Sequence, residues 1–162
     1  MCKLRLILLA AAVFVLQGCG SSRVMVLEPA QKPTTPIRSV AIVSDMSTTE
    51  VPHKYQKKFE QVLSEKLYTK YGFEKGHGLE IHYRFLQLDE GSRFSRWMLG
   101  GIGNSGEGSL TVEARFIGEK GRELGKIHTE GKIGSGAFGG SFDCAVEKAS
   151  ESLAEYIVKN FK

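Results

Sequence analysis

Histidine, cysteine and acidic side chains are the groups of this sequence that can act as nucleophiles, acid–base catalysts or metal ligands. The four histidines, His53, His77, His82 and His128, are scattered along the chain without an H-x-x-x-H pair, and the cysteines form no C-x-x-C pair. No G-x-S-x-G elbow or phosphate-binding P-loop occurs. The sequence therefore predicts no catalytic residue, no metal site and no cofactor, and we expect a protein that is not an enzyme.

Two glycine-rich segments, residues 101–106 and 134–139, match the pattern G-x-G-x-x-G. In dinucleotide-binding proteins this pattern follows a strand, opens a helix and is completed by an acidic residue about 20 positions later. The first copy leads into a predicted strand, and the second has too little chain after it for a β-α-β unit. We interpret the second copy as close packing of a strand end against a helix start, where glycine lets two backbones approach.

A short apolar run near the N-terminus ends in small residues around a cysteine. Lys3 and Arg5 precede it, and residues 6–16 contain no charged or polar side chain. A membrane-spanning helix needs about 20 apolar residues, so the run is too short to stay in the membrane as a span. A basic start, a short apolar centre and small residues at its end are typical of a secretory signal.

The sequence Leu16-Gln17-Gly18-Cys19 resembles the lipobox of bacterial lipoproteins. The resemblance implies cleavage before Cys19, a diacylglyceride on its sulfur and an acyl group on its new amine. Residues 1–18 are then a lipoprotein signal peptide; the alternative is an ordinary secretory leader with an incidental cysteine. Two or more acyl chains give stable attachment to a membrane. The resemblance also implies the outer membrane over the inner one, because Gly20 stands where an aspartate would signal retention in the inner membrane. We expect a lipid-anchored envelope protein that faces the periplasm.

Removal of the leader also changes the charge and the cysteine count. The 22 basic residues include Lys3 and Arg5, so 20 basic and 18 acidic residues remain. No block of like charge remains that is long enough for a nucleic-acid surface, and nucleic acid is excluded as a partner. With Cys2 removed and Cys19 modified, Cys144 has no second cysteine for an intramolecular disulfide. An inert thiol or an intermolecular disulfide are its two possible states.

The remaining chain has the size of one domain. Residues 19–36, with three prolines, are predicted as the lipidated cysteine and a flexible tether, although residues 24–27 could instead form a short strand. Residues 37–162 are predicted as a single globular domain. The apolar run 40–43 predicts a strand covered on both faces, and alternating patterns predict strands at about 79–88, 110–116 and 123–133 that form an antiparallel meander.

Two helices are predicted from apolar stripes with helical spacing. One begins near Pro52 and ends near Gly72, and the other occupies about 140–160. The order β-α-β-β-β-α predicts an α+β protein. Its expected architecture is a two-layer α/β sandwich with a mostly antiparallel four-stranded sheet, two helices on one face and the strand at 40–43 in the centre.

Three segments rich in glycine and arginine resemble a family of bacterial lipoproteins known as domain of unknown function 4410. They are residues 88–93, Arg96 with 100–106, and 137–140. The resemblance covers residues from about 37 to 161. It implies an envelope location and this fold, and it brings no established activity.

One predicted loop between two strands is more apolar than a solvated loop should be. It contains the single tryptophan, and its residue types are those enriched at interface cores. The candidate interaction surface is formed by Arg93, Phe94, Arg96, Trp97, Met98, Leu99 and Ile102. The alternative is a loop folded down to seal the sheet. The sequence thus favours a non-enzymatic module that binds an envelope protein or assembles with itself; the alternative is a lipoprotein that binds a small molecule or glycan.

Overall fold

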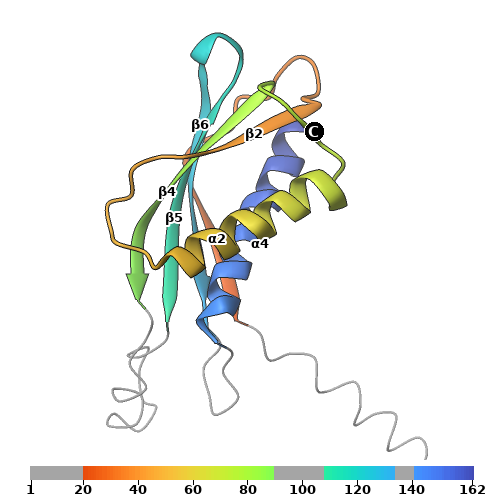
Figure 1. Ribbon diagram of the computed structural model, residues 1–162. Helices are drawn as coiled ribbons and strands as arrows, with labels where there is room; N and C mark the ends of the chain where they lie inside the picture. Colours follow the sequence, from red (N-terminus) through yellow and green to blue (C-terminus); the bar gives the residue numbers. More distant parts are fainter. Residues whose placement is uncertain (1–19, 90–107, 134–140) are drawn as a thin grey trace, which may run out of the picture.

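Residues 20–89, 108–133 and 141–162 are described by the computed structural model of the chain. They form one sheet with the strand order β1-β6-β5-β4-β2-β3. Both helices lie on the same face of this sheet, so the molecule has two layers (Figure 1). The elements are β1 (Ser21–Glu28), β2 (Ser39–Ser44), α2 (His53–Ser64), β3 (Glu74–Lys75), β4 (Leu79–Asp89), β5 (Ser109–Ile117), β6 (Glu123–Lys132) and α4 (Phe142–Phe161).

The predicted meander is present. Strands β4, β5 and β6 follow one another in sequence, and both neighbouring pairs are antiparallel. On each strand alternate side chains are buried in the core. Examples are Tyr83 on β4, Val112 on β5 and Ile127 on β6. This alternation occurs because the helices cover only one face of the sheet.

The prediction of a mostly antiparallel four-stranded sheet was wrong, because the sheet is six-stranded and mixed. β2 pairs in parallel with β4 and with the short strand β3, since the chain passes through a helix between β2 and β4 and re-enters the sheet in the same direction. β2 therefore lies near one edge of the sheet and not in its centre. Of its residues only Val40 is fully buried.

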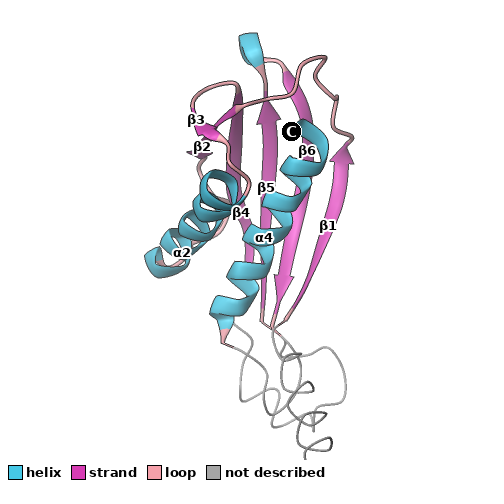
Figure 2. Ribbon diagram, turned by 90° about the vertical axis from the view of Figure 1, so that its right-hand side faces the viewer, coloured by secondary structure: helices cyan, strands magenta, loops and turns pink. Residues whose placement is uncertain are grey.

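The second additional strand, β1, lies within the segment predicted as a tether. β1 pairs antiparallel with β6 along its whole length, from Ser21 opposite Lys132 to Glu28 opposite Lys126. After β1 the chain stays attached to the domain, because Gln31 N–H donates to the Leu124 carbonyl and Ile37 N–H donates to the Phe161 carbonyl. The strand that we considered only as an alternative is thus longer than 24–27 and forms one edge of the sheet (Figure 2).

Helix α2 follows Pro52 and buries one side, formed by Tyr55, Phe59 and Leu63. These residues are spaced by four, so they lie on one face of the helix. The helix continues as a wider π-helical segment, Glu65–Lys70, and the chain turns away at Gly72, whose φ of +65° favours glycine. The Phe59 ring packs against Tyr83 and Phe85 of β4, at centroid distances of 5.0 and 5.4 Å.

Helix α4 lies across the middle of the sheet and also contacts α2. It buries residues on more than one side, including Ala145, Ala154 and Phe161, because it is covered by the sheet on one side and by α2 on another. Its backbone comes so close to β6 that a Cβ atom placed on Gly131 would lie 1.9 Å from the carbonyl oxygen of Ala145. This contact between a strand end and the start of a helix occurs at Gly131; the glycines at 134, 136 and 139 lie outside the described residues.

None of the helices in the three described ranges has the length and the apolar character needed to cross a membrane.

Candidate functional site

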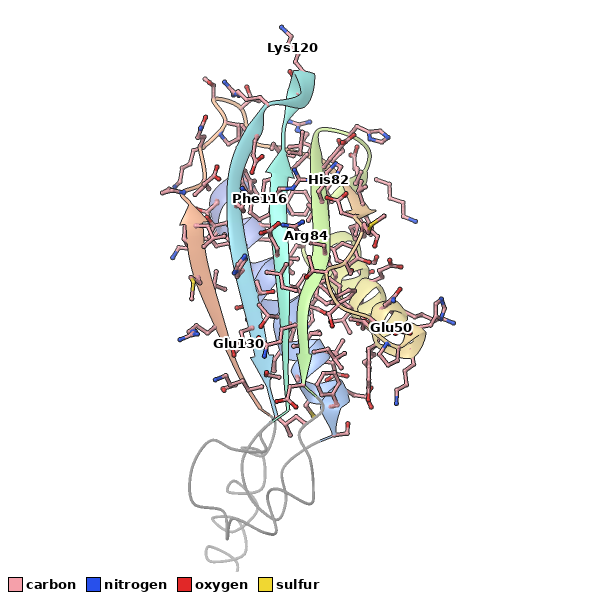
Figure 3. The ribbon with its side chains drawn as sticks, turned by 90° about the vertical axis from the view of Figure 1, so that its left-hand side faces the viewer. Glu50, His82, Arg84, Phe116, Lys120 and Glu130 are labelled. Carbon is pink, nitrogen blue, oxygen red and sulfur yellow. The ribbon has the colours of Figure 1, made fainter. Side chains whose placement is uncertain are left out.

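The face of the sheet opposite the helices is uncovered, and its side chains are mostly charged (Figure 3). They come from alternate positions of β4, β5 and β6, whose other positions point into the core. Most of these charges are paired across neighbouring strands, and two of the clusters that they form are centred on Glu113 and on Asp45.

The first cluster is centred on Glu113 of β5, which is only 7% exposed although it lies on the open face. Arg84 of β4 donates from Nε to Glu113 Oε1 at 2.8 Å, and His128 Nε2 of β6 lies 3.2 Å from Oε2. Burial alone would raise the pKa of the Glu113 carboxyl, but the hydrogen bonds with His128 and Arg84 outweigh it and lower the pKa. Glu113 is thus held as a carboxylate that links three strands.

The second cluster is centred on Asp45, directly after β2. Arg115 donates from Nη2 to Asp45 at 2.6 Å, and His82 Nδ1 lies 3.0 Å from the same carboxyl group. The other ring nitrogen of His82 lies 3.2 Å from Glu80. Burial would raise the pKa of Asp45, but Arg115 and His82 lower it. Burial would lower the pKa of His82, but Asp45 and Glu80 raise it.

A histidine between carboxylates is a common acid–base arrangement. Here each carboxylate is also bound to an arginine or to another histidine, and no hydroxyl or thiol is hydrogen-bonded to His82 or His128 among the residues that the structure describes. No group of three or more metal-ligating side chains is found in those residues either. The geometry supports cross-strand stabilisation of an open face, and the expectation that the protein is not an enzyme stays a prediction.

His82 of β4 and His128 of β6 lie on the same outer face of the sheet, two strands apart. Strand β5 separates β4 from β6, so each histidine is bound to a different carboxylate. The alternation of apolar and polar residues in the sequence indicated this outer face of the sheet. It did not show that Glu113 and Asp45 are the centres of the two charge clusters. The partners depend on the strand register, which shifts in β4 between Phe85 and Gln87, and no pattern in the sequence shows that shift.

A second surface, which the sequence analysis did not select, is the outer edge of β1. Met25, Val26 and Leu27 are exposed by 47%, 47% and 42%, and with Met46 they are the exposed large hydrophobic residues of the described ranges. β1 is the terminal strand of the sheet, so one side of its backbone has no neighbouring strand there. The signal that could have identified this surface is the apolar run 24–27 itself.

A third feature is a hollow of about 510 Å³ at the end of the sheet where β5 turns into β6. Residues 33–38 form one wall, and Gly118, Glu119 and Arg122 form another. Within the described residues, neither the Arg38 nor the Arg122 guanidinium has a hydrogen bond or an ion pair. The hollow therefore presents two cationic groups to solvent.

The predicted site residues fall largely outside the described part of the chain. This holds for the lipidation site Cys19 and for the candidate interaction residues Arg93, Phe94, Arg96, Trp97, Met98, Leu99 and Ile102. Both sets stay predictions. Asp89, which precedes the second set, ends β4 and pairs with Ser109, the first residue of β5. Cys144 lies on α4 and is partly exposed, next to the fully buried Ala145.

Comparison with known families now assigns the chain. Residues 41–137 match the family described as Domain of unknown function (DUF4410). The chain belongs to this family. The DUF4410 match begins within β2 and ends beyond β6, so it includes both charge clusters, whereas β1 lies before it. The family resemblance expected from the sequence is confirmed.

Solved structures that resemble this DUF4410 protein share little sequence with it. Two are PelC dodecamers from Paraburkholderia phytofirmans, at 15% and 14% identity and TM-scores of 0.44 and 0.43; each alignment covers 88% of this chain, and 97% and 94% of the PelC chains. A PDZ domain protein from Parabacteroides distasonis aligns at 14% identity and a TM-score of 0.39 over 93% of this chain and 38% of its own. Comparison with curated proteins finds no match.

Proposed function

We propose that this DUF4410 protein is a lipid-anchored module of the bacterial cell envelope that has no enzymatic activity and binds another protein chain through the edge strand β1. The lipobox at residues 16–19 supports the anchor, and Gly20 directly after Cys19 supports a position on the outer membrane facing the periplasm. The open edge of β1 supports the binding. The observation that carries the proposal is the exposure of Met25, Val26 and Leu27 on this edge.

Edge strands with apolar side chains readily pair with a further strand, and soluble proteins usually protect them with charges, prolines or bulges. β1 has Arg23 and Glu28 near its ends and an irregularity between Val26 and Glu28, but the stretch between the charges is apolar. A strand added here gains backbone hydrogen bonds together with side-chain contacts on both faces. The surface is therefore suited to an extended segment of another protein.

An extended segment of a different envelope protein is the first partner to test. A second copy of the chain would place its β1 antiparallel to this one about a two-fold axis. The Ser21 end of one strand would then lie beside the Glu28 end of the other, so the two predicted anchors at Cys19 would lie at opposite ends of the paired strands. A strand from a different protein has no such constraint, and it leaves the charged outer face open.

The test replaces apolar residues of the edge by lysine. Met25→Lys and Leu27→Lys put charges on β1, and Met46→Lys is the matched control because Met46 is 92% exposed and lies outside the sheet. Full-length protein is crosslinked in its native envelope, recovered by pull-down and sized under denaturing conditions. We expect the wild type and the Met46 variant to give one stoichiometric crosslinked species and the two β1 variants to lose it.

Surface substitutions of this kind change the free energy of unfolding by about 0.5 kcal/mol or less, so all variants should have nearly the same melting temperature. Unchanged crosslinking in both β1 variants would contradict binding through this edge. Mass spectrometry of the recovered protein tests the anchor separately: an acylated Cys19 supports it, and an unmodified thiol or an uncleaved leader contradicts it.

A second candidate function is binding of a small molecule or glycan, and the hollow near Arg38 and Arg122 favours it. Two guanidinium groups without ion pairs suit a ligand that carries carboxylate or phosphate groups. The hollow is formed by residues that showed no ligand-binding pattern in the sequence. Titration calorimetry with acidic oligosaccharides should show binding that the Arg38→Ala variant loses and the Arg23→Ala variant keeps.

A further inference from the structure

The point where the predicted anchor meets the folded domain is defined by the strand register. Ser21, the first residue of β1, pairs with Lys132 of β6, and Lys132 pairs with Ser109 of β5. Ser109 in turn pairs with Asp89 of β4. These four residues form one row at one end of the sheet, and α4 also begins at this end (Figure 1). We call this row, together with Ser22, Arg23, Glu130 and Ser141, the anchor end.

Covalent geometry holds Cys19 near the anchor end. Cys19 is two residues before Ser21, and an extended chain spans at most about 3.6 Å per residue, so their Cα atoms lie within about 7 Å of each other. A flexible tether up to residue 36 would instead have allowed a separation of roughly 60 Å by the same rule. Because β1 belongs to the sheet, acyl chains on Cys19 that are inserted in the membrane would hold the anchor end of the domain close to the membrane surface.

The side chains of the anchor end suit a phospholipid headgroup layer. Ser21, Ser22, Arg23, Glu130 and Lys132 surround a hollow of about 150 Å³. Arg23 Nη2 lies 3.2 Å from Glu130, and its side chain is 67% exposed; Lys132 Nζ lies 3.5 Å from the same carboxyl group. The serine hydroxyls and the two cationic groups around this hollow can bind phosphate oxygens. Asp89, at the far end of the row, is a second carboxylate of the anchor end and lies two strands away from β6. The exposed apolar residues Met25, Val26 and Leu27 follow this row along β1 and do not belong to it.

We propose that the anchor end rests on the bilayer, with its serine and basic side chains among the phosphates of the phospholipid headgroups and with the strands directed away from the membrane. This orientation rests on the proposed lipidation of Cys19. It places the turn at Lys120, at the other end of β5, far from the lipid (Figure 3). Nine residues of strand, at about 3.4 Å each, separate the two ends by roughly 30 Å.

The competing orientation lays the domain on its side, with the β1 edge against the membrane. If the apolar side chains of β1 entered the hydrocarbon core, they would take the unpaired backbone groups of this edge with them to a depth where no water can satisfy those groups. It would also bring both ends of the sheet to the same depth. The two orientations therefore differ in the distance of Lys120 from the lipid.

Fluorescence quenching by spin-labelled lipid measures this difference. Full-length protein with Cys144→Ser carries one added cysteine, either Ser141→Cys at the anchor end or Lys120→Cys at the far end; both positions are exposed. Each protein is purified with its lipid, labelled with a nitrobenzoxadiazole dye and reconstituted into vesicles of phosphatidylethanolamine and phosphatidylglycerol. A fraction of the lipid carries a nitroxide on its headgroup. We expect at least fivefold stronger quenching at position 141 than at position 120.

Equal quenching at the two positions, or stronger quenching at position 120, would overturn the proposed orientation. Quenching is read only from protein whose mass shows an acylated Cys19. An unmodified Cys19 overturns the anchor and the orientation together, whereas an acylated protein with equal quenching overturns the orientation alone. Replacing Arg23 by glutamate in the acylated protein should reduce the difference between the two positions, and replacing the distant Arg122 by glutamate should leave it unchanged.

Discussion

Replacement of Gly131 by alanine tests the closest contact between the two layers. The added Cβ atom would lie 1.9 Å from the carbonyl oxygen of Ala145, 2.8 Å from its carbonyl carbon and 2.9 Å from the backbone nitrogen of Ala149. All three atoms belong to the backbone of α4, so no side-chain rotation can relieve the clash. The first turns of the helix must move away from β6, or the strand must bend.

The size of the effect follows from these distances. Ordinary contacts of a Cβ atom begin at 3.4 Å, so the helix must retreat by about 1.5 Å at Ala145. Overpacking costs typically 1–3 kcal/mol where side chains can adjust, and a clash with rigid backbone lies at the upper end, at about 3 kcal/mol. For a domain of this size that free energy corresponds to a fall of about 10 °C in melting temperature.

Thermal unfolding followed by circular dichroism measures this loss. Gly121→Ala is the matched control, because Gly121 has no atom within 4 Å of an added Cβ and its only obstacle is a φ of +72°, which costs about 1–2 kcal/mol. We expect the Gly131 variant to melt clearly below the Gly121 variant. If the two variants melt at the same temperature, or if Gly131→Ala is the more stable, the close approach of α4 to β6 is wrong.

Three further predictions concern individual side chains. The pKa of His82 is raised in the folded protein above its ordinary value of 6.5. The stability that protonated His82 contributes is therefore present below pH 6.5 and is lost as the pH rises through the folded pKa. We expect the difference in melting temperature between wild type and His82→Gln to shrink between about pH 6 and 8.5. The pKa of Glu113 is lowered, so its contribution is present above 4.5 and is lost as the pH falls through the folded value. Glu113→Gln should lower the free energy of unfolding in urea by about 1–2 kcal/mol at pH 7 and by less at pH 3, with exposed Glu119→Gln as a neutral control. Cys144 is only partly exposed, so purified mature protein should migrate as a monomer on non-reducing gels, and a dimer band that disappears on reduction would contradict this.

The meander and both helices could be predicted from the sequence, because one-sided burial leaves a period of two on β4 to β6 and an apolar stripe on α2 and α4. The sequence predicted one apolar stripe on helix α4, whereas the helix buries residues on a second side as well. The sequence does not show that α2 covers this second side. The position of β2 could not be read from its apolar run. That run fits a central strand as well as a short parallel one near an edge, and only the pairing with β4 decides between them.

Strand β1 was missed as part of the sheet for a different reason. Its exposed residues show no alternation between buried and solvated positions, and only Val24 packs against the core. Prolines after it also made the segment similar to a linker. The charge clusters show the same limit at the level of single residues: alternation indicates that Arg84, Glu113 and His128 share a face, whereas their pairing depends on a register that includes an irregularity in β4.

The pairing of β1 with β6 also sets an order of events during biogenesis. Ser21 pairs with Lys132, which lies 111 residues later in the chain, so β1 cannot join the sheet until β6 has formed. Contacts so distant in sequence form late, after the local hairpins and helices. If Cys19 is acylated before β6 has formed, the acylating enzyme meets an extended N-terminal segment and not a finished edge strand. Closure of the sheet would then be the last step, and it would draw an already modified terminus against the domain.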